Sequence, residues 1–160
     1  MNIALHINQL SSNNIGLLDS KSNIVMDGGK FTKINFIDSY FTMNGIFIVF
    51  PINHFVIETQ NNKKNMKFQW YSTQNQNAAK ELMLLENRLL DFYISNKQKD
   101  FKKKLLLKQQ IETGYMKIYK ENHTRYNTAS IYVLKISGIW ENRDEIGITY
   151  KLFETSNLFS

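Results

Sequence analysis

The sequence predicts a mainly β protein of the α+β class, in which a barrel or a strongly curved antiparallel sheet carries one long helix. Three observations lead to this prediction. Short apolar segments bounded by Gly and Asn turns recur on both sides of a single helical pattern near residues 76–95. Two long apolar segments lie at the C-terminal end and flank a polar turn. Gly138 lies inside the first of these segments, as at a bulge that curls a sheet toward a barrel.

The N-terminal half contains the pattern of successive strands. Residues 3–10 are expected to form a first strand, which an Asn/Ser-rich loop follows. The Asp-Gly-Gly-Lys sequence at 27–30 is a strong turn signal, and the segment 31–37 after it largely alternates apolar with polar residues. A second turn at 44–45 leads into the continuous apolar segment 46–50, which is typical of a strand buried on both faces.

Pro51 is expected to end that strand, because proline cannot donate a hydrogen bond to a sheet. Residues 55–58 and 66–71 resemble two further strands, joined by a turn at 61–64. The segment 66–71 brings three aromatic residues close to lysines, which makes its placement important for function.

The hydrophobic period then changes from two to three or four. Five apolar residues recur with that spacing and mark one face of a helix over about 76–95: Ala78, Leu82, Leu85, Leu89 and Phe92. Asn75 or Asn77 is expected to be the N-cap. Residues 97–108 fit either a helix or a loop that leads into a strand.

The remaining chain predicts three strands and no second domain. Residues 115–120 alternate after Gly114, and residues 131–140 and 146–153 face each other across the polar turn 141–145. No repeat or linker interrupts the pattern, so residues 1–160 are expected to form a single domain.

Composition excludes several classes of protein. Hydrophobic residues make up 42% of the 160 residues, which is too many for a disordered chain. The absence of cysteine excludes disulfides and thiolate chemistry and fits an intracellular, reducing compartment. The N-terminus lacks the pattern of a signal peptide, and no apolar segment is long enough to span a membrane.

No catalytic motif and no cofactor site is predicted. The three histidines are far apart in sequence, and Gly28-Gly29-Lys30 lacks the other residues of a phosphate-binding loop. The acidic residues of the turn at 141–145 are the one group with metal-binding chemistry, and such turns are usually only solvated. We therefore expect a protein that is not an enzyme.

The clearest functional signal is the distribution of charge. Residues 61–125 contain 14 lysines and arginines against 6 acidic residues, whereas the segments on either side each have a small negative charge. Lysines attract a phosphate backbone, and aromatic rings stack on unpaired bases. We predict nucleic-acid contacts from the lysines and aromatic residues of this segment: Lys63, Lys64, Lys67, Trp70, Tyr71, Lys99, Lys102, Lys103, Lys104, Lys108, Lys117, Tyr119 and Lys120.

Two alternatives stay open for the aromatic residues near position 70. On a strand, Phe68 and Trp70 share one face and Tyr71 lies on the other. One face then packs in the core while the other stacks on bases, or both faces are buried. The lysines at 102–104 are likewise either phosphate contacts or a solvated charged face.

Several blocks together resemble the single-stranded-DNA-binding proteins of large nucleocytoplasmic DNA viruses, which have an oligonucleotide-binding (OB)-like core. These blocks are residues 27–30, 45–48, 85–86, 89–90, 131–141 and 147–151. The resemblance implies an OB-like fold and a place of action where viral DNA replicates, in the host cytoplasm or nucleus. It implies no particular binding residues.

Together these observations predict a non-catalytic single-stranded DNA-binding protein that supports viral DNA replication, repair or recombination. RNA is an alternative ligand, and a second copy of the chain or replication proteins are further partners; no membrane partner is expected. A structural virion component, such as a minor capsid or scaffold protein, is the main alternative. A nucleic-acid-processing enzyme is the weakest one.

Overall fold

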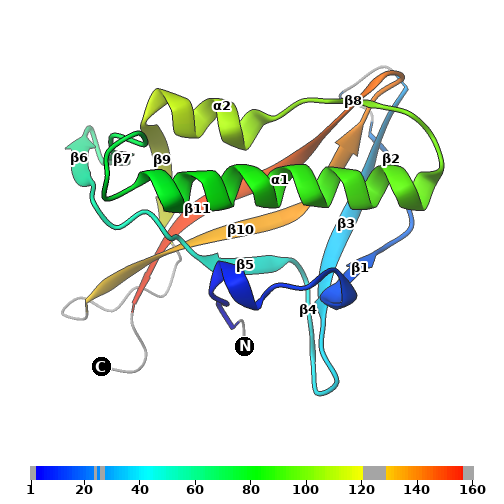
Figure 1. Cartoon of the computed structure of the whole chain (residues 1–160), viewed down its shortest axis with the longest axis horizontal. Helices are drawn as coiled ribbons and strands as arrows, with labels where there is room; N and C mark the ends of the chain where they lie inside the picture. The colour runs from blue at the N-terminus through cyan, green and yellow to red at the C-terminus, as the bar shows by residue number, and fades with distance from the viewer. Residues whose placement is uncertain (1–2, 24, 26–27, 121–128, 157–160) are drawn as a thin grey trace.

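A long hairpin of two strands forms the centre of the protein (Figure 1). The computed structural model describes residues 3–23, 25, 28–120 and 129–156. Strands β10 (Ser130–Glu141) and β11 (Glu145–Ser156) pair antiparallel along almost their whole length. Their pairing shifts register between Ile136 and Gly138, so the bulge predicted from Gly138 is confirmed.

Around this hairpin, the described residues form eleven strands in one sheet. The other strands are β1 (Ile15–Leu17), β2 (Lys21–Asn23), β3 (Gly29–Ile37), β4 (Thr42–Met43), β5 (Ile46–Val49), β6 (Val56–Gln60), β7 (Lys63–Lys67), β8 (Lys102–Lys103) and β9 (Tyr115–Lys120). The helices of the same residues are α1 (Gln76–Lys97), α2 (Leu106–Thr113) and the 3₁₀ helices η1 (Ile7–Gln9) and η2 (Ser12–Asn14).

The sheet is open rather than closed. Its main order is β1-β3-β10-β11-β9-β7-β6, and β1 and β6 lie at opposite edges. The protein is therefore of the expected mainly β, α+β class, but the described strands do not close into a barrel. The sheet is also not wholly antiparallel, because β8 and β9 run parallel to β11.

Most strands lie where the sequence predicts them, and the first one does not. The expectation of a strand at residues 3–10 is wrong: Leu5 makes an isolated bridge to Ile48, and the chain then turns into η1. Strand β5 is buried over most of its length and ends before Pro51, as predicted. Strand β2 pairs antiparallel with the start of β3, and Asp27 of the turn predicted at 27–30 lies outside the described residues.

The hairpin of β6 and β7 corrects the boundary of another strand. Asn61 and Asn62 both have positive φ angles, of 51° and 61°, which is the conformation of a two-residue type I′ turn. The second strand therefore begins at Lys63 and ends at Lys67 instead of covering 66–71. Phe68 and the aromatic residues after it consequently lie beyond the strand.

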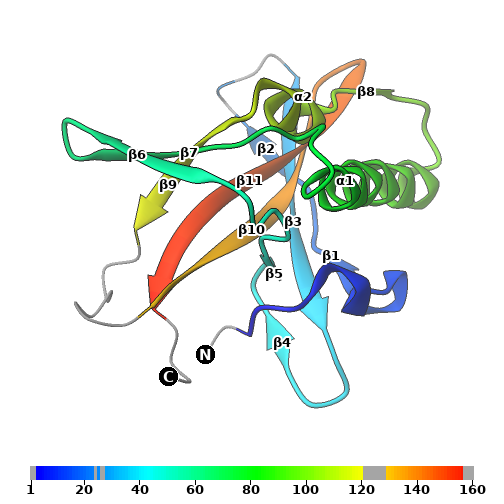
Figure 2. The same cartoon turned by 60° about the vertical axis from the view of Figure 1, so that its left-hand side comes forward.

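Helix α1 confirms the predicted helix and covers one face of the sheet together with α2 (Figure 2). Its buried residues are Ala79, Leu82, Leu85, Glu86, Leu89, Leu90 and Tyr93. Asn75 is the N-cap residue, but its side chain does not bind the helix. It donates to the carbonyl oxygens of His54 (2.8 Å) and Gln69 (3.1 Å) instead.

The ambiguous segment after α1 resolves into three parts: a loop, the short strand β8 and the start of α2. The amides of Lys102 and Lys104 donate to the carbonyl oxygens of Asp144 and Ile146, and these bonds hold β8 against the β10–β11 turn. Gly114 ends α2 with φ of 68°, and β9 follows directly, as the alternation predicted.

Candidate nucleic-acid interface

The two faces of the sheet differ in what covers them. Along β11, Ile146, Ile148 and Leu152 are buried on the side where α1 and α2 pack. Side chains alternate along a strand, so Lys151 and Phe153 point to the opposite side. We call this opposite side the helix-free face (Figure 2).

Three lysines lie next to one another on the helix-free face. Lys135 of β10 is paired directly with Lys151 of β11. Strand β9 runs parallel on the other side of β11, with Ile118 beside Leu152, so Lys117 lies beside Lys151. Adjacent strands are about 4.8 Å apart. Lys117, Lys151 and Lys135 therefore form a line across three neighbouring strands, which we call the lysine row.

Each ammonium group of the lysine row lies over an aromatic ring. The Nζ atoms of Lys117 and Lys151 are 4.6 and 4.9 Å from the ring centroid of Tyr119. The Nζ atom of Lys135 is 5.4 Å from the ring of Phe47, which is paired with it on β5. These distances are those of cation–π contacts, which stabilise a cation without neutralising its charge.

The lysine row has no acidic partner among the described residues. The ion pairs within that part of the chain join Lys30, Lys64, Lys67 and Lys103 to other carboxylates. Like charges on directly paired strand positions destabilise a sheet. The row is thus a concentrated positive charge beside the half-buried rings of Tyr119 and Phe153, whose centroids are 6.0 Å apart.

Of the residues predicted from the sequence, Lys117 and Tyr119 belong to this surface. Lys63 and Lys67 also lie on the helix-free face, on β7, because Lys67 is paired with the exposed Tyr115. Lys67 forms an ion pair with Glu58 at 3.3 Å, whereas Lys63 is exposed without a described ion pair. Lysines therefore extend from the row toward the edge of the sheet.

Lys64 is partly buried and forms an ion pair that stabilises the fold. It faces the helix side, where its Nζ lies 3.0 Å from the buried Glu154 carboxylate. Burial alone opposes ionisation of Glu154, but the hydrogen bonds from Lys64 and Ser130 outweigh it and lower the pKa of Glu154. Lys120 is exposed at the end of β9 and adds to this lowering of the pKa.

The lysine side chains of residues 99–104 point in different directions in the structure. Lys103 turns toward α1, where it pairs with Asp91 and donates to the Asn87 side chain at 2.7 Å. Lys99 donates to the Arg143 carbonyl oxygen at 3.3 Å. Lys102 and Lys104 remain exposed.

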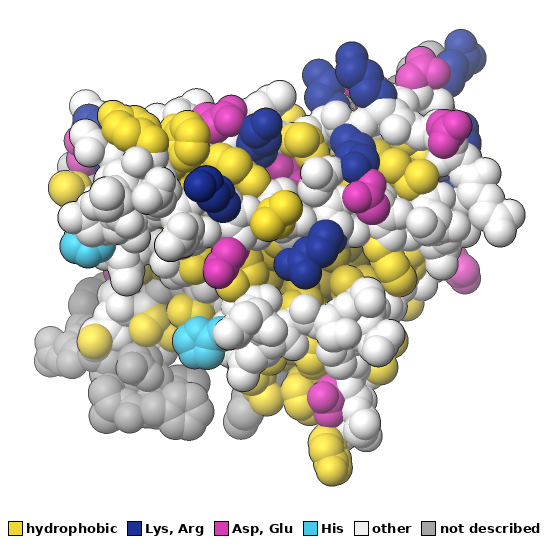
Figure 3. All heavy atoms as spheres, viewed as in Figure 1, with side chains coloured by type: hydrophobic (Ala, Val, Ile, Leu, Met, Phe, Trp, Pro, Cys, Tyr) yellow, Lys and Arg dark blue, Asp and Glu magenta, His cyan; other side chains and the backbone are white. Residues whose placement is uncertain are grey.

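Acidic side chains offset the positive charge at the end of the molecule where β8 lies. Asp100 and Asp144 are exposed near β8, and Figure 3 shows acidic groups among the basic ones where β8 and the β10–β11 turn lie. Lys108 lies on α2, so it is separated from the helix-free face by the sheet. The structure thus does not join residues 99–108 to the lysine row.

The three aromatic residues near position 70 have three different environments. Phe68 is buried and packs edge-on against Phe50, with centroids 6.3 Å apart. Trp70 is partly buried against the core and meets Tyr71 edge-to-face. Tyr71 is 65% exposed. Because none of the three lies on a strand, the expected division between two strand faces is wrong, and Tyr71 alone of the three is a large exposed ring.

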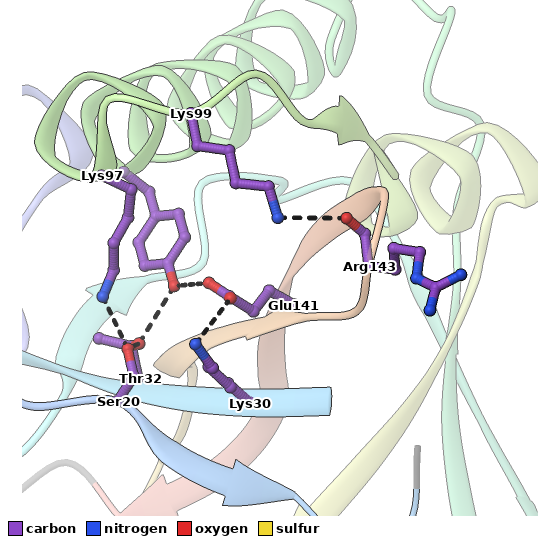
Figure 4. Close-up of polar contacts among 8 residues, drawn as sticks. Ser20, Lys30, Thr32, Lys97, Lys99, Glu141 and Arg143 are labelled. Carbon is purple, nitrogen blue, oxygen red and sulfur yellow. Dashed lines mark hydrogen bonds and ion pairs between the residues drawn. The ribbon is translucent and has the colours of Figure 1, made fainter. Parts of the chain in front are cut away.

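A polar network, buried at Tyr93, Thr32 and Glu141 and exposed at Lys97, joins α1 to the helix-covered face of the sheet (Figure 4). The Tyr93 hydroxyl donates to the Glu141 carboxylate and lies 3.3 Å from the Thr32 hydroxyl. Thr32 is bonded in turn to Ser20 at 2.6 Å, and Ser20 accepts a bond from Lys97 at 2.8 Å. Burial and the bond to Glu141 raise the pKa of Tyr93, so the phenol stays protonated as a donor.

A second buried carboxylate joins the helices. Glu86 of α1 accepts hydrogen bonds from the amides of Leu107 and Lys108, at 2.9 and 2.8 Å, and so caps the start of α2. Burial raises the pKa of Glu86 although these amides act against it. Glu141 and Glu86 are both occupied by structural contacts.

No set of three or more histidine and acidic side chains is arranged to hold a metal ion in the described ranges. Neither α1 nor α2 has the length and apolarity of a membrane-spanning helix. Comparison with known protein families, with curated proteins and with solved structures finds no match for this chain. The resemblance to viral single-stranded-DNA-binding proteins therefore stays a prediction.

Sequence reasoning missed three residues of the candidate interface: Lys135, Lys151 and Phe153. All three belong to strands that the alternation predicted correctly. The missing information was the register between these strands, which the bulge at Gly138 sets. If the residues of β10 and β11 are paired outward from the turn between them, and one extra residue is allowed on β10 for the bulge, Lys135 is paired with Lys151.

Proposed function

We propose that this protein binds single-stranded nucleic acid, DNA in the first place, across the helix-free face of its sheet and without catalysis. The observation that supports this most strongly is the lysine row. Its three lysines occupy adjacent positions on neighbouring strands and have no described carboxylate partner. The ammonium groups of Lys117 and Lys151 lie over the ring of Tyr119, which packs against Phe153, and that of Lys135 lies over Phe47. Phosphates neutralise such charges, and bases stack on such rings.

The shape of the surface favours single strands over duplex. Both α helices pack on the other face of the sheet, so neither projects from the helix-free face as a recognition helix does. A twisted sheet with lysines and aromatic rings can follow a flexible strand whose bases are unpaired. In this proposal the open sheet replaces the OB-like barrel as the binding platform. The resemblance to viral proteins extends the proposal to the coating of exposed template strands.

The test is a fluorescence titration with dT oligomers at several salt concentrations, followed by competition with a duplex of matched length. We expect the dT oligomer to compete better than the duplex. If each lysine of the row contacts one phosphate, these three contacts alone give a slope of log affinity against log salt of about −2, at about 0.7 per contact. Equal or tighter binding of the duplex contradicts the preference. Absence of binding to both contradicts the function and leaves the virion-component alternative, which predicts co-purification with capsid material.

A further inference from the structure

A hollow adjoins the lysine row where the sheet meets the C-terminal end of α2. Its volume is about 690 Å³, and its lining includes His54, Val56, Lys67, Gln69 and Tyr115. Small-ligand sites in proteins have volumes of about 300–1,000 Å³. The hollow is therefore large enough for a base and its sugar.

One side of the hollow lies on the helix-free face. Val56, Lys67 and Tyr115 are paired across β6, β7 and β9, so their side chains point to the same side of the sheet. Tyr115 is 43% exposed, and Lys117 of the lysine row is the next residue of β9 on that side. The hollow therefore lies about 7 Å from Lys117 along β9, within reach of the next nucleotide of a strand bound at the lysine row.

The walls of the hollow are fixed by hydrogen bonds. The side chain of Asn75 donates to the carbonyl oxygens of His54 and Gln69 and so holds two wall segments together. The Phe68 amide donates to the Gly114 carbonyl oxygen at 2.9 Å and closes another side. A site formed before binding loses less free energy to ordering.

The chemistry of the hollow suits a nucleobase. The Tyr115 ring offers a stacking surface, and Val56, 65% exposed, offers an apolar contact. The Gln69 side chain is exposed in the lining and has no hydrogen bond to another described residue. Its amide can pair with the polar edge of a base.

We propose that this hollow receives one unstacked base of the bound strand. The base stacks on Tyr115 and turns its polar edge toward the wall, while the adjoining phosphates lie at Lys67 and Lys117. This inference rests on the proposed function, because the lysine row must first bring the strand to the hollow. It adds a contact to a base, which the lysine row does not supply.

The experiment compares a dT oligomer with an abasic oligomer of the same length, using the full chain. We expect Tyr115→Ala to weaken binding of the dT oligomer by roughly 5- to 150-fold, the range for one stacked base, and binding of the abasic oligomer by less than about twofold. Val56→Trp, which fills the hollow from an exposed strand position, is expected to have the same selective effect. Leu84→Trp, on the exposed side of α1, is the matched control and is expected to change neither affinity.

The outcomes separate the hollow from the proposed function. If the wild-type protein binds dT and Tyr115→Ala weakens both oligomers equally, or neither, then no base enters the hollow while strand binding stands. Val56→Trp decides the same question if Tyr115→Ala proves unfolded in a thermal melt. If the wild-type protein binds neither oligomer, the proposed function and this inference are both wrong.

Discussion

Removing the charge of the lysine row is the most direct test of the interface. The substitutions Lys117→Met, Lys135→Met and Lys151→Met, made together, keep most of each aliphatic stem and remove the ammonium group. With about 0.7 counterions released per phosphate contact on a single strand, three lost contacts lower the slope of log affinity against log salt by about 2. The slope is measured by titrating a dT oligomer at several salt concentrations.

The same variant is expected to remain folded and to lose little stability. Two like-charge pairs disappear, Lys117 with Lys151 and Lys151 with Lys135, and each such pair costs roughly 0.2–1 kcal/mol. Three cation–π contacts disappear too, each contributing about 0.5–1 kcal/mol at an exposed site. These effects oppose each other, so we expect the free energy of unfolding to fall by about 1 kcal/mol, and by no more than about 2.6 kcal/mol.

The chain offers a matched control for this experiment. The substitutions Lys102→Met, Lys103→Met and Lys104→Met remove the same charge from β8 and its neighbour, where Lys103 already pairs with Asp91. We expect this control to lower the slope by less than the lysine-row variant does. If the control lowers the slope by about 2 and the lysine-row variant leaves it unchanged, the strand binds near β8 and the helix-free face is not the interface.

Three further predictions concern stability. Glu86→Ala is expected to cost about 2 kcal/mol in chemical denaturation, because two amides at the start of α2 lose their buried acceptor; an unchanged midpoint contradicts this cap. The pKa of Glu154 is lowered in the folded protein, so its ion pair with Lys64 stabilises the fold at pH values above the ordinary glutamate pKa of 4.5. We expect the wild type to be more stable than Glu154→Gln there, and this difference in the free energy of unfolding to shrink as the pH falls below 4.5. A difference that does not change with pH contradicts the ion pair. Gly114→Ala is expected to cost more than about 2 kcal/mol, because φ is 68° and the added Cβ clashes with the Phe68 carbonyl oxygen; thermal melts measure this loss.

The sequence predicted those elements whose signal is local and repeated. The period of α1 and the alternation of β9, β10 and β11 were long enough to identify them. Elements held by distant partners were missed. β8 has two residues and is held by the amides of Lys102 and Lys104, which donate to the carbonyl oxygens of Asp144 and Ile146. The chain at 3–10 resembles a strand in composition, yet beyond Leu5 it turns into η1.

Part of the candidate site could not be predicted for a related reason, because strand pairing brings its residues together. Segment charges directed attention to residues 61–125, and two members of the lysine row lie in the C-terminal segment, whose net charge is negative. Lys135 and Lys151 are isolated lysines in sequence, and they become neighbours through the pairing of β10 and β11. The lysine run at 102–104, which is conspicuous in sequence, is divided because its middle residue faces α1.

The ion pairs that other lysines form support the interpretation of the lysine row as a binding surface. Where a lysine supports the structure, a carboxylate accompanies it, as Glu154 does Lys64 and Asp91 does Lys103. The row combines adjacent like charges with rings that stabilise the cations and leave their charge intact. Such an arrangement gains most from a multivalent anion that spans neighbouring strands. A nucleic-acid strand supplies that charge at regular intervals, together with a base for the hollow at Tyr115, which an isolated phosphate or carboxylate does not.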